Sequence, residues 1–374
     1  RGTAIANLNP TISGGPVTAY SISPSLSAGL NFSTSTGRIS GTPSVVQALT
    51  VYTITATNSG GSVSFDVSIT VKDIAPTNLS YNSPNIYTIG VPIAHLHPSL
   101  SGGAVISYSI SPNLPSGLTF NNTNGEIEGT PTAVSSTAIY TVTAVNSGGS
   151  TSFGISITVN DVAPSALSYN SPNVFTVGSS IANLVPTISG TVLSYSISPA
   201  LPTGLSFDTA TGIISGIPNA VSSTAIYTVT AFNSGGSTSF GVSITVNDVA
   251  PSALSYNSPN VFTVGSPIAN LVPSFTGNVT SFSITPALPS GLSFDTTSGV
   301  ISGTPNVVSS TTIYTVTALN SGGSTSFGVS ITVNDVAPST LSYSSPNVFT
   351  VGSSIADLVP SFSGNITSFS IAPA

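Results

Sequence analysis

The chain has 374 residues, with 3 Lys or Arg, 10 Asp or Glu and a formal net charge of −7. It has no basic patch that could neutralise phosphates or anionic lipid, so we expect neither nucleic acid nor a membrane surface as a partner. The chain contains no Cys, and no apolar run reaches the roughly 18–20 residues needed to span a bilayer, so we expect no membrane insertion.

One long segment occurs four times. Its copies run from Tyr52 to Asp73, Tyr140 to Asp161, Tyr227 to Asp248 and Tyr314 to Asp335, with spacings of 88, 87 and 87 residues. Regular self-similarity at this length predicts an array of domains in a row. The predicted domains are residues 1–73 (incomplete at the N-terminal side), 74–161, 162–248, 249–335 and 336–374, the last being the start of a further repeat.

The array is expected to continue beyond this sequence. The stretch from Gly2 to Leu8 matches the stretch from Gly178 to Leu184, which lies inside a repeat. We therefore expect the 374 residues to be part of a longer array of repeats.

Each complete repeat opens with Ala-Pro, as at Ala163-Pro164. A proline placed just after a strand cannot continue the hydrogen-bond ladder, so we expect short, semi-rigid linkers. Within repeat 162–248, a first strand is predicted over 167–178 with an interruption at 171–173. A second strand is predicted over 181–189. A third follows over 192–198, with Leu193, Tyr195 and Ile197 on one face.

A segment rich in Gly and Pro follows at 201–218, and its spacing predicts two short strands joined by a loop. The repeat then ends in the long segment. In the copy at 139–161, apolar residues alternate with Thr, Ser and Gly on both sides of Asn146-Ser-Gly-Gly149, which predicts a β-hairpin with one buried face. The turn glycines are expected to accept positive φ cheaply.

About seven short strands per repeat, with no helical period, favour an all-β fold. We predict a tandem array of seven-stranded, Ig-like antiparallel β-sandwich domains. Strands of about ten residues make units near ~33 Å long, so four or five in line would form an elongated rod of well over ~100 Å.

Three motifs carry a family resemblance. They are Leu-Pro-x-Gly-Leu-x-Phe, Thr-x-Gly-x-Ile-x-Gly-x-Pro and Tyr-Thr-Val-Thr-Ala-x-Asn-x-Gly-Gly-Ser. They resemble the "putative Ig" repeats of bacterial surface proteins, which are related to cadherin-like and dystroglycan-type domains. The opening Leu-Ser-Tyr-x-Ser-Pro-Asn-x-Phe-Thr-Val-Gly is similar to repeats in large adhesins of gliding Bacteroidetes. The resemblance implies secretion, an extracellular bacterial cell-surface location and an extender or adhesin role without catalysis.

Metal sites have two candidate positions. His95 and His97 would project to one face of a strand, and such a pair can begin a zinc site, but with no Cys and no acidic cluster nearby we interpret them as surface variation. The sequence around Asp161 weakly resembles the calcium-binding linker between cadherin domains. Calcium needs six to eight oxygen ligands, however, and the remaining acidic residues are scattered along the chain. We therefore predict no metal, no cofactor and no catalytic residue. Glu126 and Glu128 are expected to face solvent.

Asp208-Thr209-Ala210 and Asp295-Thr296-Thr297 resemble the O-glycan acceptor of Bacteroidetes, so Thr209 and Thr296 are candidate O-glycosylation sites. The alternative is a loop turn begun by the Asp.

Three functions stay open. The first is an extender or stalk that holds a distal adhesive region away from the cell, with the ligand bound outside this segment and with lateral or end-to-end self-association as an option. The second is a glycan- or protein-binding module acting through exposed Tyr169 and Tyr256. The third is an accessory region of a secreted enzyme.

Overall fold

The structure, a computed structural model, describes residues 1–373. These residues form strands and turns and no helix, so none of them forms an apolar helix that could cross a membrane. Contacts divide the chain into two compact bodies. The first holds Arg1–Ser165, Ser189–Leu193 and Phe232–Thr238, and the second holds Ala166–Ile188, Ser194–Ala231 and the chain from Ser239 onward.

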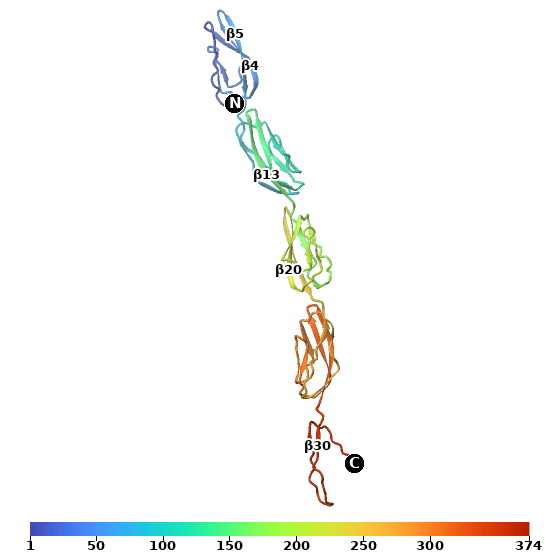
Figure 1. Ribbon diagram of the computed structural model, residues 1–374. Coiled ribbons are helices and arrows are strands. Elements are labelled where there is room, and N and C mark those ends of the chain that lie inside the picture. The colour runs from blue at the N-terminus through green and yellow to red at the C-terminus, as the bar shows by residue number, and fades with distance from the viewer. Residues whose placement is uncertain (374) are drawn as a thin grey trace. The chain divides into compact units, whose positions relative to one another are not determined.

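The second repeat lies in the first body and shows the complete strand set. Its strands are β6 (Thr77–Ser80), β7 (Asn85–Thr88), β8 (Ser99–Ser101), β9 (Ser107–Ser111), β10 (Leu118–Phe120), β11 (Ile127–Gly129), β12 (Ser135–Asn146) and β13 (Gly149–Asn160). One sheet has the order β7-β13-β12-β9, and two-stranded sheets β6-β8 and β10-β11 complete the repeat. Figure 1 labels β13 within this strand set.

The predicted hairpin is β12 with β13, joined by the two residues Ser147 and Gly148. The alternation falls as the sequence indicates, because Val142, Ile155 and Ile157 are fully buried while the Thr and Ser between them face outward. On the outer face, facing hydroxyls form hydrogen bonds across the hairpin, as between Thr143 and Ser152 at 2.9 Å. The same pair recurs as Thr55–Ser64, Thr230–Ser239 and Thr317–Ser326.

The interrupted first strand is two strands in different sheets. In the second repeat, β6 pairs antiparallel with β8, whereas β7 pairs parallel with β13. The side chain of Ser83 holds the crossing between them by accepting a hydrogen bond from the Ser156 amide at 3.0 Å. The repeat therefore has eight strands where the sequence predicts seven, and one of its pairings is parallel rather than antiparallel.

Two strand predictions for the third repeat need correction. The stretch predicted as a strand over 181–189 is mostly extended chain outside a sheet, with a single bridge at Leu184 and a short strand β16 (Thr187–Ser189). The next strand, β17 (Ser194–Ser198), begins after Leu193. Leu193 lies in the preceding bend and is 74% exposed, so it does not share the buried face of Tyr195.

The third and fourth repeats have the same eight strands in the same order, and the described residues of the first and fifth repeats form part of this set. The first contains β1 (Ala19–Ser23), β2 (Leu30–Phe32), β3 (Ile39–Gly41), β4 (Gln47–Asn58) and β5 (Gly61–Val71). The third adds β14 (Ser165–Ser168), β15 (Asn173–Thr176), β18 (Leu205–Phe207), β19 (Ile214–Gly216), β20 (Ser222–Asn233) and β21 (Gly236–Asn247). The fourth contains β22 (Ser252–Ser255), β23 (Asn260–Thr263), β24 (Ser274–Thr276), β25 (Ser281–Thr285), β26 (Leu292–Phe294), β27 (Ile301–Gly303), β28 (Ser309–Asn320) and β29 (Gly323–Asn334), and the fifth contributes β30 (Thr340–Ser342) and β31 (Ser361–Ser363).

The second and fourth repeats each have a hydrophobic core of their own. The core of the second draws all of its buried residues from 79–159, and the core of the fourth draws them from 254–333. No residue is shared, so we expect each repeat to keep its fold when another is destabilised.

A cavity in one core should therefore destabilise one repeat. Ile157→Ala removes a side chain with no exposed surface, and we expect the second repeat to lose about 2–5 kcal/mol of unfolding free energy. Hydrogen exchange followed peptide by peptide through a urea titration measures this, with Ile139→Ala at a 66% exposed position as the control. An equal loss of protection in peptides from 254–333 would contradict separate cores.

Candidate functional site

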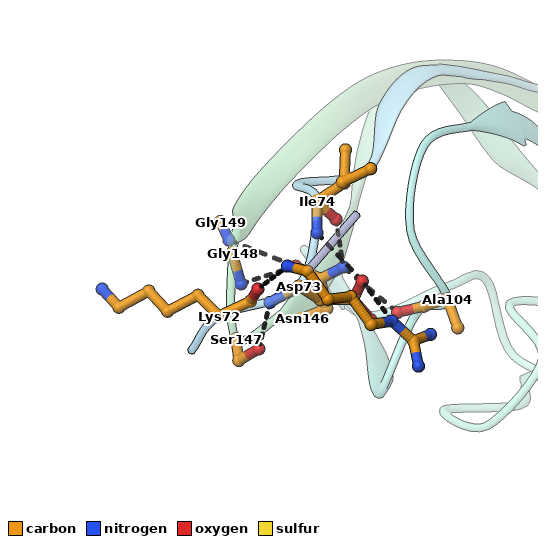
Figure 2. Close-up of polar contacts among 9 residues, drawn as sticks. Lys72, Asp73, Ile74, Ala104, Asn146, Ser147, Gly148 and Gly149 are labelled. Carbon is orange, nitrogen blue, oxygen red and sulfur yellow. Dashed lines mark hydrogen bonds and ion pairs between the residues drawn. The ribbon is translucent and has the colours of Figure 1, made fainter. Parts of the chain in front are cut away.

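The linker that precedes a repeat forms hydrogen bonds with the tip of that repeat's hairpin; we call the linker and the tip together a junction. In the first junction, the Asp73 amide donates to the Ser147 hydroxyl at 2.9 Å. The Asn146 side-chain amide donates to the Ile74 carbonyl at 2.7 Å (Figure 2). Two residues far along the chain thus pair the Asp73 amide and the Ile74 carbonyl, which have no partner within a sheet.

Asn146 connects the tip to the linker. Its Oδ1 accepts hydrogen bonds from the amides of Gly148 at 2.8 Å and Gly149 at 3.2 Å, which shapes the turn. Its Nδ2 also donates to the Ala104 carbonyl at 3.2 Å, on the loop beside the tip. The residue is only 6% exposed, and both its polar atoms are paired. Asn146 therefore fixes the turn, the loop and the linker together.

Gly148 is required because the linker backbone passes directly against it. A Cβ at this position would lie 2.1 Å from the Asp73 carbonyl oxygen, well inside van der Waals contact. Of the two turn glycines, Gly148 and Gly149, only Gly149 has a positive φ, at 152°. The sequence prediction that both turn glycines serve positive φ is therefore right for Gly149 and wrong for Gly148.

The same contacts recur at the next two linkers, each within one compact body. In the second junction, the Asp161 amide donates to Ser234 Oγ at 2.9 Å and Asn233 Nδ2 donates to the Val162 carbonyl at 2.7 Å. In the third, the corresponding bonds are Asp248 to Ser321 at 2.9 Å and Asn320 to Val249 at 2.6 Å. A Cβ on Gly235 or Gly322 would again lie 2.0 or 1.9 Å from a linker carbonyl oxygen.

The linker aspartates use their carboxylates as hydrogen-bond acceptors. Asp248 Oδ1 accepts from the Val249 amide at 2.8 Å, and its Oδ2 accepts from the Asn278 side chain at 3.0 Å. Asp161 does the same with the Val162 amide and the Thr191 hydroxyl. Among the described residues, no group of three ionisable side chains with metal-ligand spacing occurs at a linker. The turn-capping interpretation of Asp161 therefore accounts for its oxygens.

The two histidines lie against two acidic side chains, which the sequence did not indicate. His95 Nδ1 is 2.5 Å from Glu126 Oε1, and His97 Nε2 is 3.7 Å from the same oxygen. His95 Nε2 is 3.5 Å from Glu128 Oε2. Hydrogen bonds from His95 and Asn124 hold the pKa of Glu126 below its ordinary value. The expectation that no acidic cluster lies near the histidines is wrong, because the chain at Leu96 pairs antiparallel with Ile127 of β11.

Thr209 and Thr296 are both exposed, in equivalent loops. The preceding aspartates cap these loops: Asp208 accepts from the Ala210 amide and Asp295 from the Thr297 amide, each at 2.8 Å. These bonds also hold the pKa of both aspartates below the ordinary value. The aspartates therefore fit the alternative of a loop turn begun by the Asp, and modification of the two threonines stays a prediction.

Tyr169 and Tyr256 are core residues rather than exposed ones. They are 8% and 7% exposed, and each hydroxyl donates to a glycine carbonyl, Gly212 or Gly299, at 2.6 Å. Burial raises the pKa of the Tyr256 hydroxyl to about 12. A binding surface built on these two rings is therefore excluded.

An apolar groove opens in the first repeat, where Phe65 is 75% exposed. In the second repeat the equivalent Phe153 packs against Tyr81 of the preceding segment, with ring centroids 6.3 Å apart. The third and fourth repeats have the same ring pairs, Tyr169 with Phe240 and Tyr256 with Phe327. The groove thus lies where a chain segment packs in those repeats.

The comparisons with known proteins assign the chain to a family. The family model described as "Putative Ig domain" matches residues 2–72, 68–160, 156–247 and 243–334. The chain belongs to this family. The expectation of tandem Ig-like repeats is therefore confirmed, and so is the all-β fold class. The narrower likeness to adhesins of gliding bacteria stays a prediction.

Relatives of this Putative Ig domain array include the "Serine-rich adhesin for platelets" of Staphylococcus aureus. The protein of strain MRSA252 is 33% identical over 162 residues, which is 42% of this chain and 12% of that protein. The protein of strain USA300 has the same identity over 7% of its length. The chain therefore spans only a small part of these relatives.

Solved structures to which the chain is similar include the N-terminal eight Ig domains of Down Syndrome Cell Adhesion Molecule, with 16% identity and a TM-score of 0.36 over 89% of this chain and 47% of that one. Titin fragment I67–I69 has 17% identity and a TM-score of 0.35 over 70% of this chain and 98% of that one.

The junction contacts predict the effect of one added methyl group. In Gly235→Ala, the Cβ would overlap the Asp161 carbonyl oxygen, so we expect the linker to separate from the tip and lose two hydrogen bonds. Each such bond contributes about 0.5–1.5 kcal/mol, so exchange of the Asp161 amide should accelerate roughly 5- to 150-fold, measured by NMR. The control is Gly60→Ala, where the nearest atom is Asn58 Oδ1 at 3.3 Å. Unchanged exchange of the Asp161 amide in Gly235→Ala would contradict the junction.

The glycan prediction is tested on protein from its native source. We expect peptides that contain Thr209 or Thr296 to carry a mass excess, because both side chains are exposed beside an aspartate. No Lys or Arg follows Lys72, so the digestion needs chymotrypsin rather than trypsin. Unmodified masses for both peptides would rule out the modification.

Proposed function

We propose that this chain is an extender segment of an extracellular bacterial surface adhesin, in which the junctions stiffen a series of Ig-like repeats into a rod. The observation that carries the proposal is the junction itself, because the same bonds from Asn and Ser to the linker occur three times. Membership of the Putative Ig domain family and similarity to a staphylococcal adhesin support the setting.

A stiff extender requires that neighbouring repeats cannot swing freely. A linker of four residues with unpaired backbone groups would allow many orientations, and ordering it would cost entropy. Here side chains of the tip hold one amide and one carbonyl of each linker. The glycine contact leaves the linker little space to move. The domain boundaries that we propose, at 73/74, 161/162 and 248/249, fall at these linkers.

We propose no catalytic role for the chain. The nucleophile of an enzyme needs a base within reach, and both histidines of the chain lie in the second repeat, where they contact carboxylates. The ligand of the adhesin would then be bound by regions outside this segment.

The extender proposal predicts a narrow distance distribution across a junction. The chain has no Cys, so Ser136→Cys with Ser223→Cys places one spin label on an exposed, equivalent site in each of two neighbouring repeats. Because the junction restricts the linker, we expect one narrow peak by pulsed electron resonance, and Gly235→Ala should broaden it while Gly60→Ala should not.

A distance distribution as broad in the unmodified junction as in Gly235→Ala would refute the stiff extender.

A chelator should leave the narrow peak unchanged, because the linker aspartates accept hydrogen bonds from protein donors. Light scattering on the same samples should give the mass of a monomer, and a defined oligomer would point instead to a self-assembling filament.

A further inference from the structure

The second repeat carries four ionisable side chains on one outward face. The extended segment before β8 pairs antiparallel with β11 through Leu96 and Ile127, whose amides and carbonyls exchange bonds of 2.9 and 3.0 Å. Both residues point into the core, at 8% and 0% exposure. Residues on either side of them must then point outward, because side chains alternate along extended chain. Those residues are His95, His97, Glu126 and Glu128.

The register brings these side chains within reach of one ion. Across an antiparallel pair, facing residues lie about 4.5–5.5 Å apart at Cβ, and here one ligand atom from each of His95, His97 and Glu126 lies within 4.8 Å of the others. Glu126 Oε1 is the shared neighbour of both rings. An ion placed between His95 Nδ1, His97 Nε2 and this oxygen would replace the direct contacts. Both imidazole side chains are exposed, at 54% and 66%.

The surroundings hold the ligands in place. Asn124 donates to the other carboxylate oxygen, Glu126 Oε2, at 3.1 Å, which leaves Oε1 directed at the rings. Glu128 Oε2 lies 3.5 Å from His95 Nε2. It is placed to accept a hydrogen bond from the Nε2–H group when Nδ1 binds a metal. A carboxylate on the far nitrogen of a metal-binding histidine fixes the tautomer and raises ligand basicity.

The chemistry of the donors selects the class of metal. Two imidazoles and one carboxylate suit zinc and its neighbours in the transition series. Calcium requires six to eight oxygens, which this face does not provide. We propose that His95, His97 and Glu126 bind one divalent transition-metal ion of the zinc class, with Glu128 orienting His95.

The other repeats have the same backbone without these ligands. The equivalent bridges are Leu8–Ile39, Leu184–Ile214 and Leu271–Ile301. Around the last of these, the outward residues are Asn270, Val272, Val300 and Ser302. The site is thus specific to the second repeat, and the fourth repeat shows which residues the backbone accepts in its place.

The experiment titrates ZnCl₂ into the full chain, produced without a histidine tag, by calorimetry, and records the visible spectrum of the Co²⁺ form. We expect one ion per monomeric chain and the absorption of a low-symmetry, four- or five-coordinate Co²⁺ site. His95→Asn with His97→Val, the residues found in the fourth repeat, should abolish binding without loss of fold. Glu126→Gln should weaken binding by more than tenfold, and Glu128→Gln by about tenfold to a hundredfold.

The reverse design makes the test independent of folding losses. Asn270→His, Val272→His, Val300→Glu and Ser302→Glu together should give the fourth repeat a second ion per chain. Absence of zinc binding to the natural chain would overturn the proposal. So would binding that persists in the His95→Asn, His97→Val variant, since the ion would then lie elsewhere.

Discussion

The linkers must satisfy their own backbone, and this need determines how the repeats are joined. Four residues separate β13 from β14, and their polar groups have left one sheet before entering the next. The chain meets the need with side chains of the following hairpin, so the tip acts as a binding surface for the linker. The three tips that contact a linker carry Asn-Ser-Gly-Gly, although only one of the two glycines in each has the positive φ of the turn.

Much of the fold follows from the sequence because it depends on neighbours in the chain. Alternation at residues such as Val142 and Ile155 is a local property, and it predicts the hairpins and their buried faces. Strand pairing is not local. Nothing around Pro84 says that the chain changes sheets there, and the parallel partner of β7 lies more than sixty residues away. The exposure of Leu193 depends on a bend that interrupts an otherwise regular pattern.

The sites were harder to predict because they combine distant segments. Gly148 looks like a turn residue until Asp73 is placed beside it, and His95 looks isolated until the register of Leu96 with Ile127 is known. One signal was present in the sequence. When the repeats are aligned with one another, positions 95, 97, 126 and 128 of the second repeat all differ from their counterparts in the third and fourth repeats, and all four are ionisable. Joint departures of this kind within one chain indicate residues that meet in space.

The hydroxyl pairs on the hairpins have a consequence for the environment in which the chain can work. Cross-strand contacts on a β-sheet surface are often between opposite charges, which dissolved ions screen over about 8–10 Å at physiological strength. Here the outer faces are held by neutral bonds such as Thr143–Ser152 and Thr317–Ser326. Such bonds involve no net charge, so a hairpin of this kind keeps the same strength in fresh water and in brine.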